Sequence, residues 1–178
     1  MNGKINHTLI TLDGLNFDSQ LEADYYSQII KTDKGITNLV VHPAYVLMPD
    51  FVFHKEQERG LRYTADFAYD KGGKHYIIEI KGFETVDYIM RKKMFLNYLS
   101  KKSDSDDWVY LELGFAKYCG FQPMDTLKHL RQMRKKYNLL VAKEKLTATD
   151  KKKIAKLKEE YGKYLPEPKK PKPTKPGK

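Results

Sequence analysis

Apolar and polar residues alternate along two neighbouring stretches of the chain, residues 63–69 and 74–80. Successive side chains of a β-strand point to opposite faces, so this alternation predicts two strands, each with one apolar face. The pair Gly72-Gly73 lies between them and is typical of a two-residue hairpin turn. The pattern therefore predicts a β-hairpin in which the two strands pair side by side.

Helical spacing of apolar residues predicts four helices, at residues 17–30, 85–102, 124–140 and 150–165. In the second helix, the residues expected to cover the sheet are Val86, Ile89, Met90, Leu96 and Leu99. Residues 108–114 are mostly apolar and predict one further core strand. Strands and helices together indicate an α/β fold.

Composition narrows the class of protein. Hydrophobic residues make up 40% of the 178 residues, which is enough for a folded core. The single cysteine, Cys119, excludes an internal disulfide framework and a cysteine-built zinc site, and it favours a reducing compartment. The first residues lack the apolar core of a signal peptide, and no apolar run is long enough to span a bilayer. We therefore expect a soluble, cytoplasmic protein without a membrane partner.

The positive charge of the chain indicates nucleic acid as a partner, because the formal net charge is +10 and the pI about 9.4.

Residues 166–178 hold five lysines, five prolines and one glutamate, which predicts an extended, disordered tail that either attracts phosphate or only adds solubility. The two helices before it are also basic, and their lysines either lie along DNA or form a solvated face. We expect a core at 1–120, a basic helical extension at 121–165 and the tail at 166–178.

Candidate chemistry lies on the predicted hairpin. Glu79 and Lys81 stand on one face of their strand, about 6.6 Å apart. Pairing across the glycine turn brings Asp66 close to Glu79, and two such carboxylates repel each other unless a cation or a proton separates them. Mg2+ usually sits on one or two carboxylates, waters and a substrate phosphate, so Asp66 and Glu79 form a candidate magnesium site. Lys81 would face the same phosphate.

An acidic residue on one strand and Glu79-Ile80-Lys81 on the next resemble the signature of the PD-(D/E)xK nuclease superfamily. Gly82 follows the lysine directly, and Ala65 stands where the signature has its proline. Over residues 8–100 the chain is similar to an uncharacterised phage-encoded family of that superfamily, related to Holliday-junction resolvases. The segments that carry this likeness are Leu12 to Tyr26, His42 to Pro49 and Lys81 to Thr85.

The resemblance implies a restriction-endonuclease-like core, in which helices flank a mixed central β-sheet, and metal-dependent phosphodiester cleavage. It also implies a role for Glu22, because many members, including archaeal Holliday-junction resolvases and transposon-end endonucleases, carry a glutamate on their first helix as an outer metal ligand. The pattern Ser19-x-x-Glu22 is at the same time a capping box, in which Glu22 only satisfies an N–H group at the helix start. Both roles remain open.

We therefore expect an endodeoxyribonuclease that uses Mg2+ or Mn2+. Asp66, Glu79 and the Ile80 carbonyl are the expected metal ligands, and Glu22 contacts the cation directly or through water. Lys81 either orients the attacking water or stabilises charge on the phosphate. The residues expected to contact DNA are Arg91, Lys93, Arg131, Arg134 and Lys135. For Lys92, by contrast, we expect a simple exposed face.

Branched DNA is the favoured substrate, with a Holliday-junction resolvase role in phage recombination or packaging. Resolvases of this kind act as symmetric dimers, so we expect a homodimer, located in the host cytoplasm if the protein is phage-encoded. A nuclease for duplex or single-stranded DNA in transposition, restriction or host DNA degradation is the alternative enzyme. A non-catalytic DNA-binding protein on a nuclease fold is the alternative class. No Walker loop or dinucleotide fingerprint occurs, so no nucleotide cofactor is expected.

Overall fold

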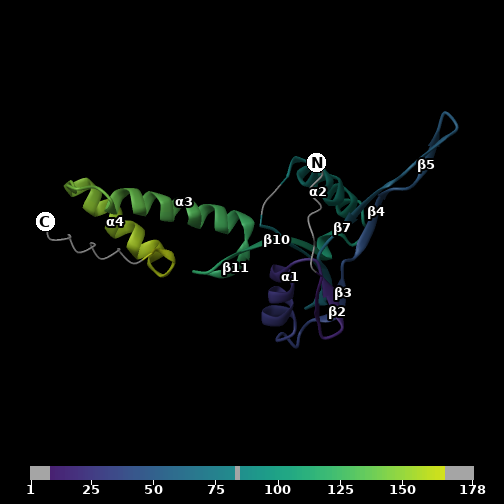
Figure 1. Ribbon diagram of the computed structural model, residues 1–178, viewed down its shortest axis with the longest axis horizontal. Coiled ribbons are helices and arrows are strands. Elements are labelled where there is room, and N and C mark those ends of the chain that lie inside the picture. Colours follow the sequence, from purple (N-terminus) through teal and green to yellow (C-terminus); the bar gives the residue numbers. More distant parts are fainter. Residues whose placement is uncertain (1–8, 83–84, 167–178) are drawn as a thin grey trace, which may run out of the picture. The chain divides into compact units, whose positions relative to one another are not determined.

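The computed structural model describes residues 9–82 and 85–166, and the chain divides into two compact units, Met1–Phe115 and Ala116–Lys178 (Figure 1). The first unit contains a mixed sheet and the second contains two long helices. The predicted tail falls almost entirely on residues 167–178, which lie outside the described part of the chain.

The predicted hairpin is present. It consists of β8 (Phe67–Lys71) and β9 (Lys74–Ile80), which pair in antiparallel orientation with Phe67 opposite Ile78. Gly72 and Gly73 form the two-residue turn with φ angles of 58° and 77°, in the left-handed region that glycine adopts without strain. This register sets Asp66 next to Glu79.

The hairpin forms the middle of the first unit's sheet. β10 (Trp108–Ala116) runs parallel to β9, and β3 (Thr37–Val41) runs antiparallel to β8, which gives the order β10-β9-β8-β3. The further core strand predicted for residues 108–114 is therefore confirmed, and its parallel pairing makes the sheet mixed. Because β10 is parallel to β9, its acidic residue Glu112 lies directly opposite Glu79.

The strand predicted for residues 63–69 is wrong in one respect, because it is interrupted at Asp66. β7 (Leu61–Thr64) leaves the central sheet and pairs with β4 (Ala44–Met48), while β8 begins at Phe67. A further hairpin, β5 (Phe51–Phe53) and β6 (Glu56–Glu58), connects β4 to β7. At the break, the Asp66 amide donates to the Ile78 carbonyl at 3.1 Å and the Asp66 carbonyl accepts from the His42 amide at 3.0 Å.

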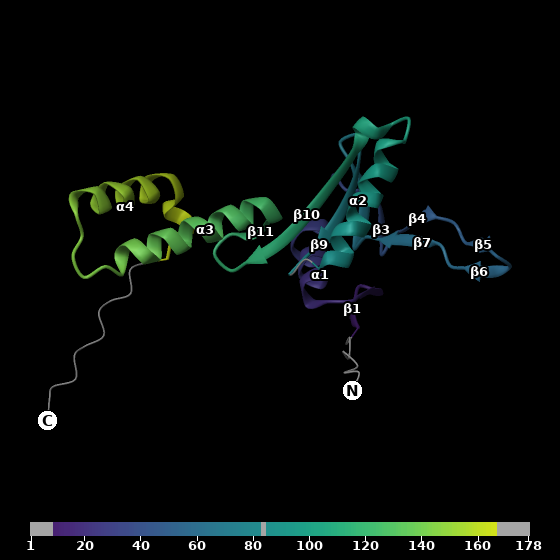
Figure 2. The same cartoon turned by 90° about the horizontal axis from the view of Figure 1, so that it is seen from above.

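Helices cover both faces of this sheet (Figure 2). The helix α1 (Gln20–Tyr25) continues as a π-helix, η1 (Tyr26–Ile30), and Tyr25 packs on Phe67 with 5.7 Å between ring centroids. A short hairpin of β1 (Ile10–Leu12) and β2 (Leu15–Phe17) precedes α1. On the opposite face, Phe95 and Leu99 of α2 (Val86–Ser100) share a core cluster with Ile77 of β9. The protein thus has a mixed α/β fold with a central mixed sheet flanked by helices.

The sheet-facing side of α2 differs from the prediction. Val86, Ile89, Met90 and Leu96 are exposed, whereas Phe95 and Leu99 are buried, and Tyr88 is partly buried against the same cluster. Tyr88, Lys92, Phe95 and Leu99 follow one another at spacings of three and four residues, so they form a single stripe. Leu99 is confirmed among the residues predicted to cover the sheet, whereas the other four are exposed, because Tyr88, Lys92 and Phe95 occupy the rest of the inner stripe.

The second unit contains the basic helices predicted from the sequence. After β11 (Gly120–Pro123) come α3 (Met124–Val141) and α4 (Ala148–Tyr161), followed by a 3-10 turn, η3 (Gly162–Tyr164). Another 3-10 turn, η2 (Ser105–Asp107), precedes β10 in the first unit. Tyr137, Leu140 and Leu157 form the core between α3 and α4. Within the described residues, neither these helices nor any other is long and apolar enough to cross a membrane.

Candidate functional site

A buried carboxyl group, that of Glu79, and a partly buried one, that of Asp66, meet where β7 ends and the β8–β9 hairpin begins. Asp66 accepts a hydrogen bond at Oδ2 from the Ile80 amide at 2.5 Å, so its side chain is fixed against the end of β9. Glu79 is only 2% exposed and accepts a hydrogen bond at Oε2 from the Tyr63 hydroxyl at 2.9 Å. The structure therefore brings together the two acids that the hairpin pattern predicted to be adjacent.

Electrostatics at this pair favour the neutral carboxyl. Burial is the largest cause, and the neighbouring Glu79 charge adds to it, so that together they raise the pKa of Asp66 to about 8. The Glu22 carboxylate raises the pKa further, while the Ile80 amide and Lys81 oppose the shift. Burial also raises the pKa of Glu79, against the lowering effects of Lys81 and Tyr63. A site that disfavours negative charge to this extent would be stabilised by a cation.

Lys81 lies on the same face as Glu79. Its ammonium group forms an ion pair with Glu79 Oε1, and it also lies over the Tyr88 ring, 4.5 Å from the centroid. The Lys81 amide donates to the Leu113 carbonyl at 2.7 Å, which fixes the lysine backbone beside β10. The charged end of Lys81 is thus held at the carboxylate pair by contacts from β9 and α2.

A chain of tyrosine hydroxyls joins Glu79 to a third acid, the partly buried Glu112. The hydroxyls of Tyr63 and Tyr110 are 2.9 Å apart, those of Tyr110 and Tyr88 are 2.8 Å apart, and Tyr88 donates to Glu112. The chain from Glu79 to Glu112 has four oxygen–oxygen contacts but only three hydroxyl protons. All four contacts can be hydrogen bonds only when the carboxyl group at one end of the chain also carries a proton. Burial raises the pKa of Tyr63, Tyr88 and Tyr110, which keeps these hydroxyls protonated.

Lys92 has a different environment from the one predicted. We expected a simple exposed face, but its side chain is only 24% exposed and its ammonium group pairs with Glu112. The reason is its position on the inner stripe of α2, which places it over β10. Glu112, Lys92 and the three tyrosines were missed by sequence reasoning. An acidic residue in the middle of the apolar run 108–114 was the only local signal for Glu112.

A cavity of about 230 Å3 opens beside this network. The residues that line it are Arg62, Tyr63, Thr64, Glu79, Lys81, Asp87, Tyr88 and Arg91. Arg91, one of the predicted DNA-contacting residues, therefore borders the same space as Glu79 and Lys81, and it forms an ion pair with Asp87 at 3.1 Å. Arg62 is a further basic residue at this opening that the sequence did not indicate. Lys93 is exposed on α2 and does not line the cavity.

Glu22 forms part of the predicted capping box, because its amide binds the Ser19 side chain but its carboxylate accepts from the Asp18 amide and not from the Ser19 amide. Its amide donates to Ser19 Oγ at 3.2 Å, while its carboxylate accepts from the Ser19 hydroxyl at 2.7 Å and from the Asp18 amide at 3.0 Å. The same carboxylate lies 3.1 Å from Nε2 of His42. Since the His42 amide binds the Asp66 carbonyl, His42 connects the start of α1 to the strand break at Asp66. Glu22 is thus both a cap and a charge that acts on Asp66.

The donor set fits a small, hard cation in number and chemistry. Among the described residues, no group of three or more His, Cys, Asp and Glu side chains is arranged to hold a metal ion. Mg2+ does not need such a group, since one or two carboxylates with waters and a substrate phosphate are usual. Asp66 and Glu79 supply two carboxylates, and burial, the main cause of the raised pKa of each, disfavours the negative charge that a cation would offset.

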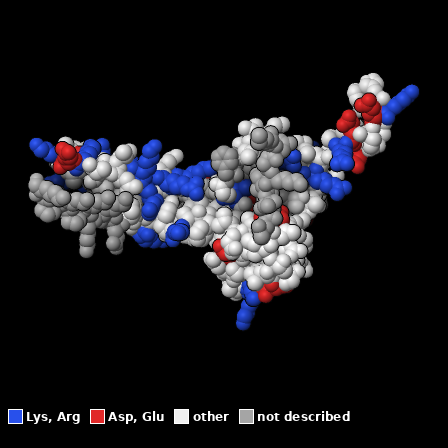
Figure 3. Space-filling model, in the orientation of Figure 1, with Lys and Arg blue, Asp and Glu red and all other residues white. Residues whose placement is uncertain are grey.

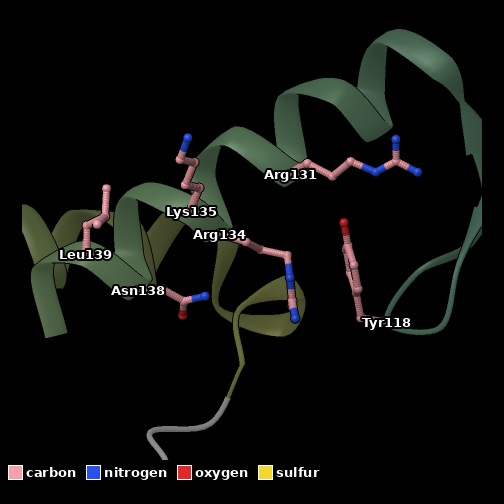
Figure 4. A pocket seen from close by; sticks show the side chains of 6 residues that line it. All are labelled: Tyr118, Arg131, Arg134, Lys135, Asn138 and Leu139. Carbon is pink, nitrogen blue, oxygen red and sulfur yellow. The ribbon is translucent and has the colours of Figure 1, made fainter. Parts of the chain in front are cut away.

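The other predicted DNA-contacting residues, Arg131, Arg134 and Lys135, belong to the second unit, where they line a cavity along α3 (Figure 4).

Charge is divided unevenly between the two parts of the chain. Residues 1–115 contain 14 Lys and Arg against 17 Asp and Glu, a net charge of −3, whereas residues 116–178 contain 19 against 6, a net charge of +13. The attraction of the chain for polyanions therefore resides in the second part.

The first unit defines a mixed α/β protein with two adjacent carboxyl groups, one of them buried, at a strand junction. Residues 2–115 match the family described as "Protein of unknown function (DUF1064)". This match covers more than half of the chain, so the protein belongs to this family, and the matched region ends at the residue where the first unit ends. A comparison with curated proteins found no match.

Proposed function

We propose that this protein is a metal-dependent DNA endonuclease with a restriction-endonuclease-like core in its first unit. The observation that carries the proposal is the junction of Asp66, Glu79 and Lys81, which brings together two carboxyl groups with raised pKa values and one lysine, and at which Glu79 and Lys81 line an open cavity. A phosphodiester needs such a set, because charge must be neutralised on the phosphate and a water must be activated.

Asp66 and Glu79, with the Ile80 carbonyl, would hold Mg2+ or Mn2+. A bound cation supplies Lewis-acid chemistry, which polarises the phosphate and lowers the pKa of a nearby water. In the proposed reaction the Lys81 ammonium group gives up its ion pair with Glu79. It then either stabilises the negative charge that develops on the phosphate or orients the attacking water. Glu22 would contribute directly or through water, because its carboxylate oxygens accept hydrogen bonds from Ser19 and Asp18 and contact the His42 ring, which leaves a lone pair free.

Arg62 and Arg91 would receive the strand that is cut, because both border the cavity beside Glu79 and Lys81. Lys93 would contact the DNA farther along α2. We propose branched DNA as the preferred substrate and a homodimer as the active form, as resolvases of this kind cut two strands. Duplex and single-stranded DNA are the alternative substrates, and a cleavage assay on all of these DNA forms distinguishes them.

The test is a cleavage assay on the full-length protein with labelled four-way junction, fork, duplex and single strand, each in Mg2+, Mn2+ or EDTA. Asp66→Asn and Glu79→Gln should reduce cleavage to background while DNA binding stays equal or becomes tighter, since each removes negative charge. Lys81→Met keeps the packing over Tyr88 and should lower the rate by about a hundredfold or more.

Matched variants test whether the removal of any charge from the same hairpin reduces cleavage. Asp70→Asn removes a carboxylate from β8 that pairs with His75, and Lys74→Met removes a lysine from the start of β9. Both should cleave normally. Metal-dependent cleavage that survives in Asp66→Asn or Glu79→Gln would refute the site, and absence of cleavage on every substrate would leave a DNA-binding protein on this fold.

Glu22 is resolved by two substitutions in the same assay. Glu22→Gln keeps a hydrogen-bond acceptor for the cap but removes the charge, so it should lose activity with little change in stability. Ser19→Ala removes the cap and should cost about 1 kcal/mol of stability while the folded protein stays active. Normal cleavage by Glu22→Gln would assign Glu22 to the cap alone.

A further inference from the structure

A second cavity, of about 440 Å3, lies entirely within the second unit (Figure 4). The residues that line it are Tyr118, Arg131, Arg134, Lys135, Asn138 and Leu139. Tyr118 belongs to the connection between β10 and β11, and the other five residues recur at helical spacing along one side of α3. No acidic side chain is among the lining residues.

Three cations converge on this cavity, and their charges are not neutralised locally. Arg131 and Lys135 are exposed, and neither forms an ion pair with any described residue. Arg134 is held in place, because its guanidinium stacks over the Tyr118 ring at 3.9 Å and donates to the Tyr164 carbonyl. An arginine fixed in this way loses little conformational freedom when it binds an anion.

The Tyr118 hydroxyl supplies an independent sign of a missing ligand. It is buried, and no described residue forms a hydrogen bond with it. Figure 4 shows this hydroxyl directed toward the Arg131 side chain, with the Arg134 guanidinium alongside the ring. Arginine and lysine can only donate, so the hydroxyl proton finds no acceptor among the cations of the cavity. The group that would satisfy this site is a compact anion rich in acceptor oxygens.

We infer that the cavity formed by Tyr118, Arg131, Arg134 and Lys135 binds a backbone phosphate of DNA. This inference rests on the proposed function for the choice of DNA and deepens it by naming where the strand is held. Lys and Arg side chains recur along the two helices of the second unit (Figure 3), and a DNA strand carries regularly repeated phosphates. The first unit, with its net charge of −3, is poorly suited to hold a polyanion unaided.

Binding of the full-length protein to fluorescently labelled DNA in EDTA tests the inference without cleavage. Lys135 and Lys136 make a matched pair, because they are adjacent and exposed on α3, but Lys136 lines a different groove that contains Glu160. Arg131→Ala and Lys135→Ala should each weaken binding by about eightfold near 0.1 M salt and reduce the slope of log affinity against log salt by about 0.9. Lys136→Ala should change neither quantity.

Tyr118→Phe removes only the hydroxyl and keeps the ring under Arg134. It should weaken binding by about fivefold with an unchanged salt slope and an unchanged thermal unfolding temperature. A parallel titration with inorganic phosphate, followed by calorimetry, distinguishes a free-phosphate site. If Arg131→Ala abolishes phosphate binding but DNA affinity stays the same, the assignment to DNA is overturned.

Equal losses in Lys135→Ala and Lys136→Ala would also overturn the inference, because they would indicate a diffuse basic surface. Unchanged binding in Arg131→Ala and Tyr118→Phe would do the same. A failure of the proposed cleavage activity can be distinguished from a failure of this inference. A protein that binds DNA through this cavity but cuts no substrate in Mg2+ or Mn2+ retains the phosphate site and loses the endonuclease.

Discussion

Burial and the Glu79 carboxylate raise the pKa of Asp66 to about 8, so the metal-free protein holds a proton on this carboxyl near neutral pH. The unfolded chain releases the same proton near pH 4. Between these two values the folded state binds more protons than the unfolded state, and the free energy of unfolding therefore falls as the pH rises. A raised carboxyl pKa thus makes this site locally destabilising at the pH where the protein is expected to act.

We predict that, in EDTA, the free energy of unfolding decreases between about pH 4 and pH 8, by up to about 1.4 kcal/mol per pH unit. Asp66→Asn should flatten this dependence, because the substituted amide does not titrate. Urea denaturation at a series of pH values measures the effect, and added Mg2+ should stabilise the wild type more at pH 8 than at pH 5.

Asp70→Asn provides the control for that experiment. Hydrogen bonds from Asn38 and His75 lower the pKa of Asp70, so its contribution has the opposite sign and is lost as the pH falls. The Asp70→Asn protein should therefore keep the decline toward pH 8. A decline of equal steepness in Asp66→Asn and the wild type would show that Asp66 ionises normally.

At the scale of elements, the pair β4 and β7 determines where Tyr63 and Arg62 stand relative to Glu79. Gly60 precedes β7 where the chain passes close to the end of β4, and a Cβ atom there would lie 2.1 Å from the Met48 carbonyl oxygen. The Gly60 amide also donates to Asp50 Oδ1 at 2.7 Å. The hairpin can close only if residue 60 has no side chain.

We predict that Gly60→Ala destabilises the protein by about 2–4 kcal/mol, because the atoms in contact are backbone and cannot move aside. Gly72→Ala is the comparison, since its φ is 58° but no atom lies within 4 Å of the added Cβ. That substitution should cost only about 1–2 kcal/mol of backbone strain. Equal losses in chemical denaturation would show that the close approach at Gly60 is relieved by a shift of β4.

At the scale of the whole molecule, the two parts of the chain differ in charge and in the chemistry that they carry. The carboxylate site belongs to residues 1–115, which match the DUF1064 family, whereas residues 116–178 carry a net charge of +13. A net negative charge repels phosphate, so in the proposed function DNA binding depends on the second part. The proposed division is therefore chemistry in the first unit and retention of DNA in the second.

Removal of residues 167–178 deletes five lysines and one glutamate from the second part. We predict unchanged thermal stability and unchanged cleavage at saturating DNA, but weaker binding with a flatter salt dependence, because each lost phosphate contact lowers the slope by about 0.9. A titration of DNA binding between low and high salt measures both quantities. An identical slope and affinity after truncation would assign the DNA contacts to α3 and α4 alone.

Several local features followed from the sequence by itself. Alternation and the Gly72-Gly73 turn predicted the β8–β9 hairpin, and the hairpin register brought Asp66 to Glu79 and placed Lys81 on the Glu79 face. The Ser19 cap and a strand at residues 108–114, which the structure extends to Ala116, were also predictable. These features depend on backbone geometry over a few residues, which residue types specify directly.

Only the tertiary structure determined what surrounds that hairpin. The strand break at Asp66 depends on hydrogen bonds with His42 and Ile78, and the tyrosine chain joins Tyr63, Tyr88 and Tyr110 from three separate elements. The partnership of Lys92 with Glu112 depends on which stripe of α2 faces β10. Such contacts join residues 12 to 47 positions apart. Periodicity shows that an element has an inner face, but packing of the whole chain decides which residues of other elements meet it.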